Sequence, residues 1–150
     1  MSDFFSLYSH DFLRIACCVP RTRVADAPFN LAETLRLAAE GDKAGAALMV
    51  FPELGLSSYA IEDLLLQDAL LDEVERSIAE VVKASKKLNP VLIVGAPLRV
   101  CGRLYNTAIV VHRGAILGVV PKIYLPNYRE FYEKRHFVSG ANVLEPEIRL

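Results

Sequence analysis

Two chargeable side chains in this sequence directly follow apolar segments. Glu53 comes after ALMVFP, and Lys122 comes after ILGVVP. In open α/β sheets, ligands bind and reactions take place just past the ends of buried strands. A carboxylate and an ammonium group held together there could act as a general base and an oxyanion stabiliser. The spacing leaves a second interpretation open, in which each group is a solvated charge at the end of a strand.

The segment 121–137, PKIYLPNYREFYEKRHF, is the second candidate for function. It holds five aromatic residues among alternating charges, and Pro121 and Pro126 argue against one uninterrupted helix. It is too aromatic for an ordinary solvated loop and too charged for a core strand. Its two glutamates and the overall net charge of -1 argue against nucleic-acid binding.

The cysteines and histidines predict neither a disulfide framework nor a metal site. Cys17 and Cys18 lie next to each other in an apolar run, so we predict small, buried strand residues. Cys101 stands in a predicted turn, and the three cysteines together match no zinc spacing. Three histidines also lack metal-ligand spacing: His10, His112 and His136.

Length and composition indicate one globular domain. The chain has 150 residues, of which 53% are hydrophobic and 23% charged. The near-neutral charge gives no broad footprint for nucleic acid or an anionic membrane. Asp3 and Asp11 do not fit a signal peptide, and no apolar run spans a bilayer, so we expect a cytoplasmic protein. The last residues, 140–150, begin like a strand and stop, which suggests a fragment.

The elements that would position these groups alternate at first and then become antiparallel. A predicted helix begins at Asn30, with Glu33 as capping-box partner, and a second helix runs over 63–88. The short turns CGR and RGA predict a meander of antiparallel strands. The pattern favours an α/β layered fold with a mixed sheet and helices on one face. The predicted buried strands before the meander are 13–19, 46–51 and 91–97.

Three segments resemble signatures of the nitrilase, or carbon–nitrogen hydrolase, superfamily. They are FPELGLSSYAIEDLL, GRLYNTAIVV and PKIYLPNYREFYEKRHF. The third resembles most closely the glutaminase domains of glutamine-dependent NAD synthetases, and the resemblance extends over about residues 13–145. It implies a nitrilase-like layered α-β-β-α sandwich with mixed sheets. Residues 1–150 would be an incomplete, N-terminal part of that carbon–nitrogen hydrolase (glutaminase) domain.

The resemblance also implies roles for single residues. The family uses a Glu–Lys–Cys triad, which places the general base on Glu53 and the oxyanion-stabilising ammonium on Lys122. Glu133 matches an auxiliary catalytic glutamate, with an exposed helix glutamate as the alternative. Tyr128 and Tyr59 match substrate-binding positions, although both could be packing residues.

The nucleophile is the main departure from the family pattern. The family's cysteine lies downstream of the third segment, and none of the chain's three cysteines has that context. We therefore expect the isolated 150-residue chain to be inactive. No phosphate-binding loop is present, so ATP and magnesium would bind a separate synthetase domain, and no cofactor is expected in this chain.

The implied function is a glutamine amidohydrolase. It would release ammonia from L-glutamine for the ATP-dependent conversion of deamido-NAD to NAD, in a cytoplasmic protein that forms homo-oligomers. Two alternatives stay open: another amidase or carbamoylase of the superfamily, or a non-catalytic assembly partner.

Overall fold

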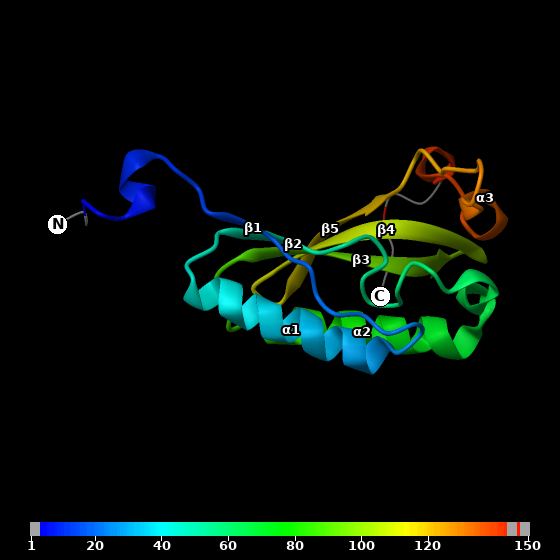
Figure 1. The fold of residues 1–150 in the computed structure, drawn as a ribbon, viewed down its shortest axis with the longest axis horizontal. Coiled ribbons are helices and arrows are strands. Elements are labelled where there is room, and N and C mark those ends of the chain that lie inside the picture. Colours follow the sequence, from blue (N-terminus) through cyan, green and yellow to red (C-terminus); the bar gives the residue numbers. More distant parts are fainter. Residues whose placement is uncertain (1–3, 144–146, 148–150) are drawn as a thin grey trace.

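The fold is built on one five-stranded mixed sheet (Figure 1). The structure, a computed structural model, describes residues 4–143 and residue 147. The sheet order follows the chain order, with β1, β2 and β3 parallel and β3, β4 and β5 antiparallel. The mixed sheet and the meander predicted from the turns are therefore confirmed. The strands are β1 (Ile15–Cys17), β2 (Leu48–Val50), β3 (Val91–Val100), β4 (Arg103–His112) and β5 (Ala115–Pro121).

Two long helices, α1 (Ala27–Lys43) and α2 (Asp68–Ser85), lie side by side on one face of the sheet (Figure 1). Val74, Ile78 and Val81 of α2 recur at helical spacing and are fully buried or nearly so. They belong to the same core as the side chains of β3 that alternate towards the helices. The shorter helical elements are η1 (Leu7–His10), η2 (Glu62–Leu66), α3 (Glu133–His136) and η3 (Gly140–Asn142).

Both predicted helices have different boundaries in the structure. The segment predicted as one helix over 63–88 is divided into η2 and α2, because Gln67 between them has an extended backbone with ψ of 120°. The first helix begins before Asn30, and its N-cap is Asp26, whose side chain accepts a hydrogen bond from the Phe29 amide. Pro28 is tolerated because the first turn of a helix needs no amide donor there.

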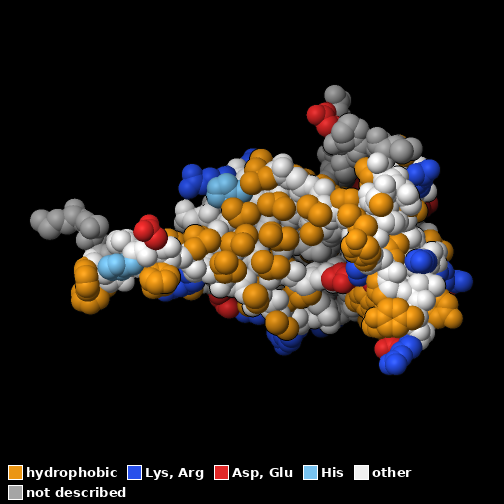
Figure 2. Space-filling view, turned by 90° about the horizontal axis from the view of Figure 1, so that it is seen from above, with side chains coloured by type: hydrophobic (Ala, Val, Ile, Leu, Met, Phe, Trp, Pro, Cys, Tyr) orange, Lys and Arg blue, Asp and Glu red, His pale blue; other side chains and the backbone are white. Residues whose placement is uncertain are grey.

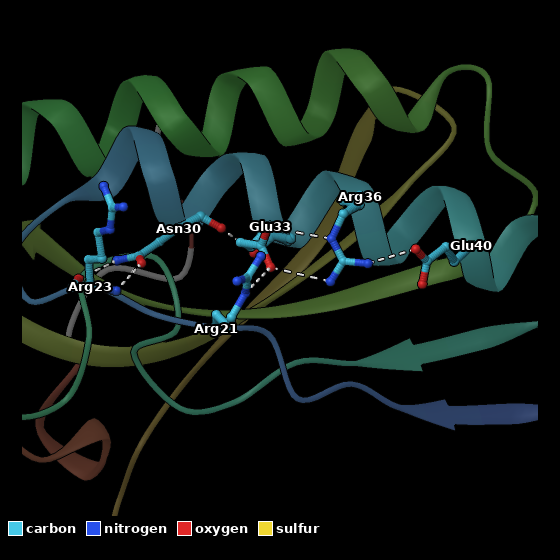
Figure 3. Close-up of polar contacts among 7 residues, drawn as sticks. Arg21, Arg23, Asn30, Glu33, Arg36 and Glu40 are labelled. Atoms are coloured by element: carbon cyan, nitrogen blue, oxygen red, sulfur yellow. Dashed lines mark hydrogen bonds and ion pairs between the residues drawn. The ribbon is translucent and has the colours of Figure 1, made fainter.

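Asn30 is therefore a buried helix residue, and it joins two loops (Figure 3). Its amide nitrogen donates to the carbonyl oxygens of Arg23 (2.9 Å) and Leu56 (3.1 Å). Its side-chain carbonyl oxygen accepts a hydrogen bond from the backbone amide of Arg23 at 2.8 Å. Asn30 thus fixes the loop before α1 against the loop that follows β2.

Glu33, the predicted partner in the capping box, serves in an ion-pair network instead (Figure 3). Its carboxylate lies 3.2 Å from an Arg36 nitrogen and 3.5 Å from Arg21. Arg36 also pairs with Glu40 one turn further along α1. The hydrogen bond from Arg36, aided by the charges of both arginines, lowers the pKa of Glu33.

The face of the sheet opposite the helices is open, and Figure 2 shows hydrophobic side chains gathered over it. Ile15 and Val120 are 54% and 60% exposed. Cys17 is exposed as well, so the predictions of a buried first strand and a buried Cys17 are wrong. Cys18, on the helix side, is partly buried, and burial followed by the neighbouring Cys17 raises the pKa of its thiol. No helix among residues 4–143 is long and apolar enough to cross a membrane.

Candidate active site

Glu53 stands in a tight turn that the backbone of β3 supports. Just past the end of β2, the Phe51 amide still donates to the Ile93 carbonyl of β3 at 2.9 Å, and Pro52, which has no amide hydrogen, cannot extend this pairing. The turn then lies so close to Gly95 that a Cβ atom there would be 2.9 Å from Cα of Glu53. A residue without a side chain is therefore required in β3 beneath the turn.

Lys122 is held on both sides of its backbone. It follows β5, and its amide donates to the Asn106 carbonyl of β4 at 2.8 Å. Its own carbonyl accepts from the Gly140 amide at 2.8 Å. These two hydrogen bonds fix the point from which the long side chain reaches the end of β2.

The structure brings Glu53, Lys122 and Glu133 together. The Lys122 ammonium donates to Oε1 of Glu53 at 2.7 Å and to Oε1 of Glu133 at 2.9 Å. Glu53 and Lys122 are 69 positions apart in the sequence, so only the sheet places them side by side. The ammonium bridges one half-exposed and one buried carboxylate, with side-chain exposures of 42% and 5%.

Glu133 begins the short helix α3 and points into the protein. The alternative of an exposed helix glutamate is therefore wrong, because the side chain is almost fully buried. Its Oε1 also accepts a hydrogen bond from the Tyr59 hydroxyl at 2.8 Å. Its Oε2 has no hydrogen-bond partner within the part of the chain that the structure describes. A buried acceptor of this kind is costly unless a further donor reaches it.

At neutral pH the surrounding groups favour a protonated lysine beside a protonated phenol. Burial alone would lower the pKa of Lys122, but hydrogen bonds to Glu133 and Glu53 outweigh it and raise the pKa. Burial, and then the hydrogen bond to Glu133, raises the pKa of Tyr59. At neutral pH Lys122 is thus a cation available to a developing negative charge, and Tyr59 stays a hydrogen-bond donor.

Asn106 is a residue of this site that sequence reasoning missed. Its side chain is buried in β4, and its amide nitrogen donates to Oε1 of Glu53 at 2.5 Å. Asn106 therefore holds the side chain of Glu53 and the backbone of Lys122 at the same time. The available signal was an amide side chain within the otherwise largely apolar strand LYNTAIVV.

Tyr128, by contrast, does not reach the three charged groups. It is 64% exposed and packs edge-on against Phe131, with ring centroids 5.7 Å apart. Cys101 lies in the turn between β3 and β4, and Cys17 lies in β1, at the opposite edge of the sheet from β5. Among the residues described, no group of histidine, cysteine and carboxylate side chains could hold a metal ion.

Comparisons with known proteins show which family the sequence matches. A sequence model of the family described as carbon–nitrogen hydrolase matches residues 14–149. Over 138 residues the chain is 56% identical to the glutamine-dependent NAD(+) synthetase of Mycobacterium tuberculosis, covering 92% of this chain and 20% of that protein. The match to the synthetase of Mycobacterium leprae covers the same shares at 52% identity. The chain spans about a fifth of the length of these relatives.

Solved structures show the same fold. The glutamine-dependent NAD(+) synthetase from Cytophaga hutchinsonii matches with a TM-score of 0.80 and 26% identity, over 85% of this chain and 22% of that one. An amidase from a Nesterenkonia species matches with a TM-score of 0.75 and 24% identity, over 85% of this chain and 48% of that one. The predicted nitrilase-like α/β fold is confirmed, with one helical layer and one sheet layer in the described residues.

Proposed function

Because this chain belongs to the carbon–nitrogen hydrolase family, we propose that Glu53, Lys122 and Glu133 serve the glutaminase site of a glutamine-dependent NAD synthetase. The observation that carries the proposal is the Lys122 ammonium, which follows β5 and is hydrogen-bonded both to Glu53, beyond the end of β2, and to Glu133, at the start of α3. A lone surface ion pair would not need a buried second carboxylate, a buried Asn106 and a tyrosine donor around it.

The proposed reaction needs a cysteine thiol, which we assign to a segment outside these 150 residues. Glu53 accepts the thiol proton, and the thiolate attacks the carboxamide carbon of L-glutamine. Lys122 stabilises the oxyanion of the tetrahedral intermediate with a charge that is already in place. The carbon–nitrogen bond then breaks, and the nitrogen takes the proton from Glu53 and leaves as ammonia.

The second half of the reaction uses the same base. Glu53 accepts a proton from water, whose oxygen attacks the thioester, and the returning proton restores the thiol as glutamate leaves. Glu133 holds Lys122 in place, since it binds the same ammonium and is itself held by Tyr59. Tyr59 lines the site, and Tyr128 would contact glutamine only if its exposed loop closes over the substrate.

The remaining parts of the proposal concern the whole protein. Residues 1–150 would form part of the glutaminase domain, and ammonia would pass to a synthetase domain that acts as a ligase. That domain would bind ATP and magnesium and convert deamido-NAD to NAD. We also propose a cytoplasmic protein that forms homo-oligomers. The length of the relatives supports a larger protein, because the matched residues cover only about a fifth of the Mycobacterium tuberculosis synthetase.

The test compares two nitrogen sources in the full-length gene product that contains these residues. Glu53→Gln and Lys122→Ala should abolish ammonia release from glutamine, and both should leave NAD synthesis from free ammonium intact. The matched control is the exposed pair on α2, in which Lys83 donates to Glu80 at 3.0 Å. Glu80→Gln and Lys83→Ala should change neither activity.

Two results would contradict the proposal. If the unmodified protein releases no ammonia from glutamine, the assigned reaction is wrong. If Glu53→Gln or Lys122→Ala also loses ammonium-dependent synthesis while the control variants keep it, the two activities do not lie in separate sites.

A further inference from the structure

An ion-pair cluster outside the site joins the two chain segments that supply Tyr59 and Glu133. Asp63, in η2, accepts hydrogen bonds from Nε (2.8 Å) and from a terminal nitrogen (2.9 Å) of Arg135. Nε2 of His136 lies 3.1 Å from the same carboxylate. Both partners belong to α3, where they follow Glu133 by two and three positions.

The short helix α3 depends on such contacts for its position. It has four residues, and one helical turn does not hold together by itself in water. Towards the protein, the buried ring of Phe137 anchors its end. On the solvent side, the turn is held by Asp63. Its two carboxylate oxygens accept from two nitrogens of the planar Arg135 guanidinium, and this bidentate geometry restricts the orientation of the Arg135 side chain as well as its distance from Asp63.

The cluster and the site share the same two chain segments. Tyr59 precedes Asp63 by four positions, and its hydroxyl meets Glu133 at 2.8 Å. The Asp63–Arg135 pair therefore helps to fix the distance between the segment that carries Tyr59 and the helix that carries Glu133. If the pair is lost, α3 is held only from the protein side, and we expect Glu133 to shift from its present distances to the Tyr59 hydroxyl and the Lys122 ammonium.

We propose that Asp63 is a positioning residue of the glutaminase site, which acts through Arg135 and α3 on the placement of Glu133. This inference rests on the proposed function. Hydrogen bonds from Arg135 and His136 lower the pKa of Asp63, so the carboxylate stays charged throughout the neutral range. Because the Asp63 side chain is 60% exposed, its loss should alter the geometry of the site far more than the stability of the fold.

The first experiment measures glutamine hydrolysis by the full-length protein with Asp63→Asn, which keeps the shape but removes the charge. We expect kcat for glutamine to fall on the order of tenfold, since displacement of a positioned group by about 1 Å can cost up to a hundredfold. Ammonium-dependent synthesis should not change, and Asp63→Glu should restore part of the rate. The matched control is Asp68→Asn, which removes the exposed ion pair with Arg99 and should have no effect.

The second experiment repeats Asp63→Asn in a protein that already carries Glu133→Gln. A residue that acts through Glu133 has no effect left once that carboxylate is gone, whereas general damage to the fold lowers the residual rate again. An unmodified protein that does not hydrolyse glutamine would overturn the proposed function. Normal hydrolysis by Asp63→Asn, or an equal loss in both backgrounds, would overturn this inference alone.

Discussion

Gly95 offers the sharpest test of how the fold places the general base. A Cβ atom at this position would be 2.6 Å from the backbone nitrogen of Leu54 and 2.9 Å from Cα of Glu53, and it would also overlap the Pro52 carbonyl. Ordinary contact begins at 3.4 Å, so the Leu54 nitrogen must move by about 0.8 Å in Gly95→Ala. All the obstructing atoms are backbone atoms, and no side-chain rotation can relieve the overlap.

We expect two effects of Gly95→Ala in the full-length protein. Shifting the turn that carries Glu53 by nearly 1 Å should lower kcat/KM for glutamine by about a hundredfold. Overpacking at the same point should destabilise the domain by about 1–3 kcal/mol. Ammonia release from glutamine and thermal unfolding measure the two effects.

The control for this substitution is Gly118→Ala in β5. A Cβ at Gly118 meets no atom within 4 Å, so both activity and stability should stay close to those of the unmodified protein. A kcat/KM of Gly95→Ala within about twofold of the unmodified protein would show that the position of Glu53 does not depend on the close approach of β3.

Three further changes test the other side of the site. In Gly140→Ala the new Cβ would be 2.6 Å from the Pro121 carbonyl oxygen, so Lys122 should shift and glutamine hydrolysis should fall; an unchanged rate would show that this contact is not needed. Asn106→Ala removes the donor to Glu53 and should cost about 1.5 kcal/mol, or roughly tenfold in kcat/KM, whereas a change below twofold would exclude that role. Lys122 has a raised pKa, so its contribution to stability is complete below its ordinary value of 10.5 and is lost as the pH rises through the folded value. The difference in unfolding free energy between the unmodified protein and Lys122→Met should therefore shrink at high pH, and growth of that difference would contradict the assignment.

The sequence was most informative where a strand ends. The positions of Glu53 and Lys122 after apolar segments predicted that both could lie at one edge of the sheet, and a 2.7 Å hydrogen bond joins them. The role of Asn106 was not predicted because its partner Glu53 is 53 positions away, and the residues next to Asn106 in the sequence do not indicate that its side chain faces a carboxylate. Hydrophobic patterns report that a strand is apolar, not which layer covers it, and for this reason Cys17 was expected to be buried.

Helix boundaries were harder to predict for a local reason. Asp26 and Asn30 are both good capping residues, and the choice between them depends on tertiary contacts. Asn30 binds the Leu56 carbonyl 26 positions away, which no local rule anticipates. The break at Gln67 likewise lies within a segment whose composition is helical throughout.

The long sequence separations within the site have a consequence for the order of folding. Three of its hydrogen bonds join residues 53, 69 and 74 positions apart, and the Asp63–Arg135 pair spans 72. Closing such loops costs entropy that local hairpins do not, so the β3–β4 and β4–β5 hairpins can form well before these contacts. The Lys122 ammonium is only 11 positions from Glu133, but it meets Glu53 only once β2 has paired with β3, so the complete site forms late in folding.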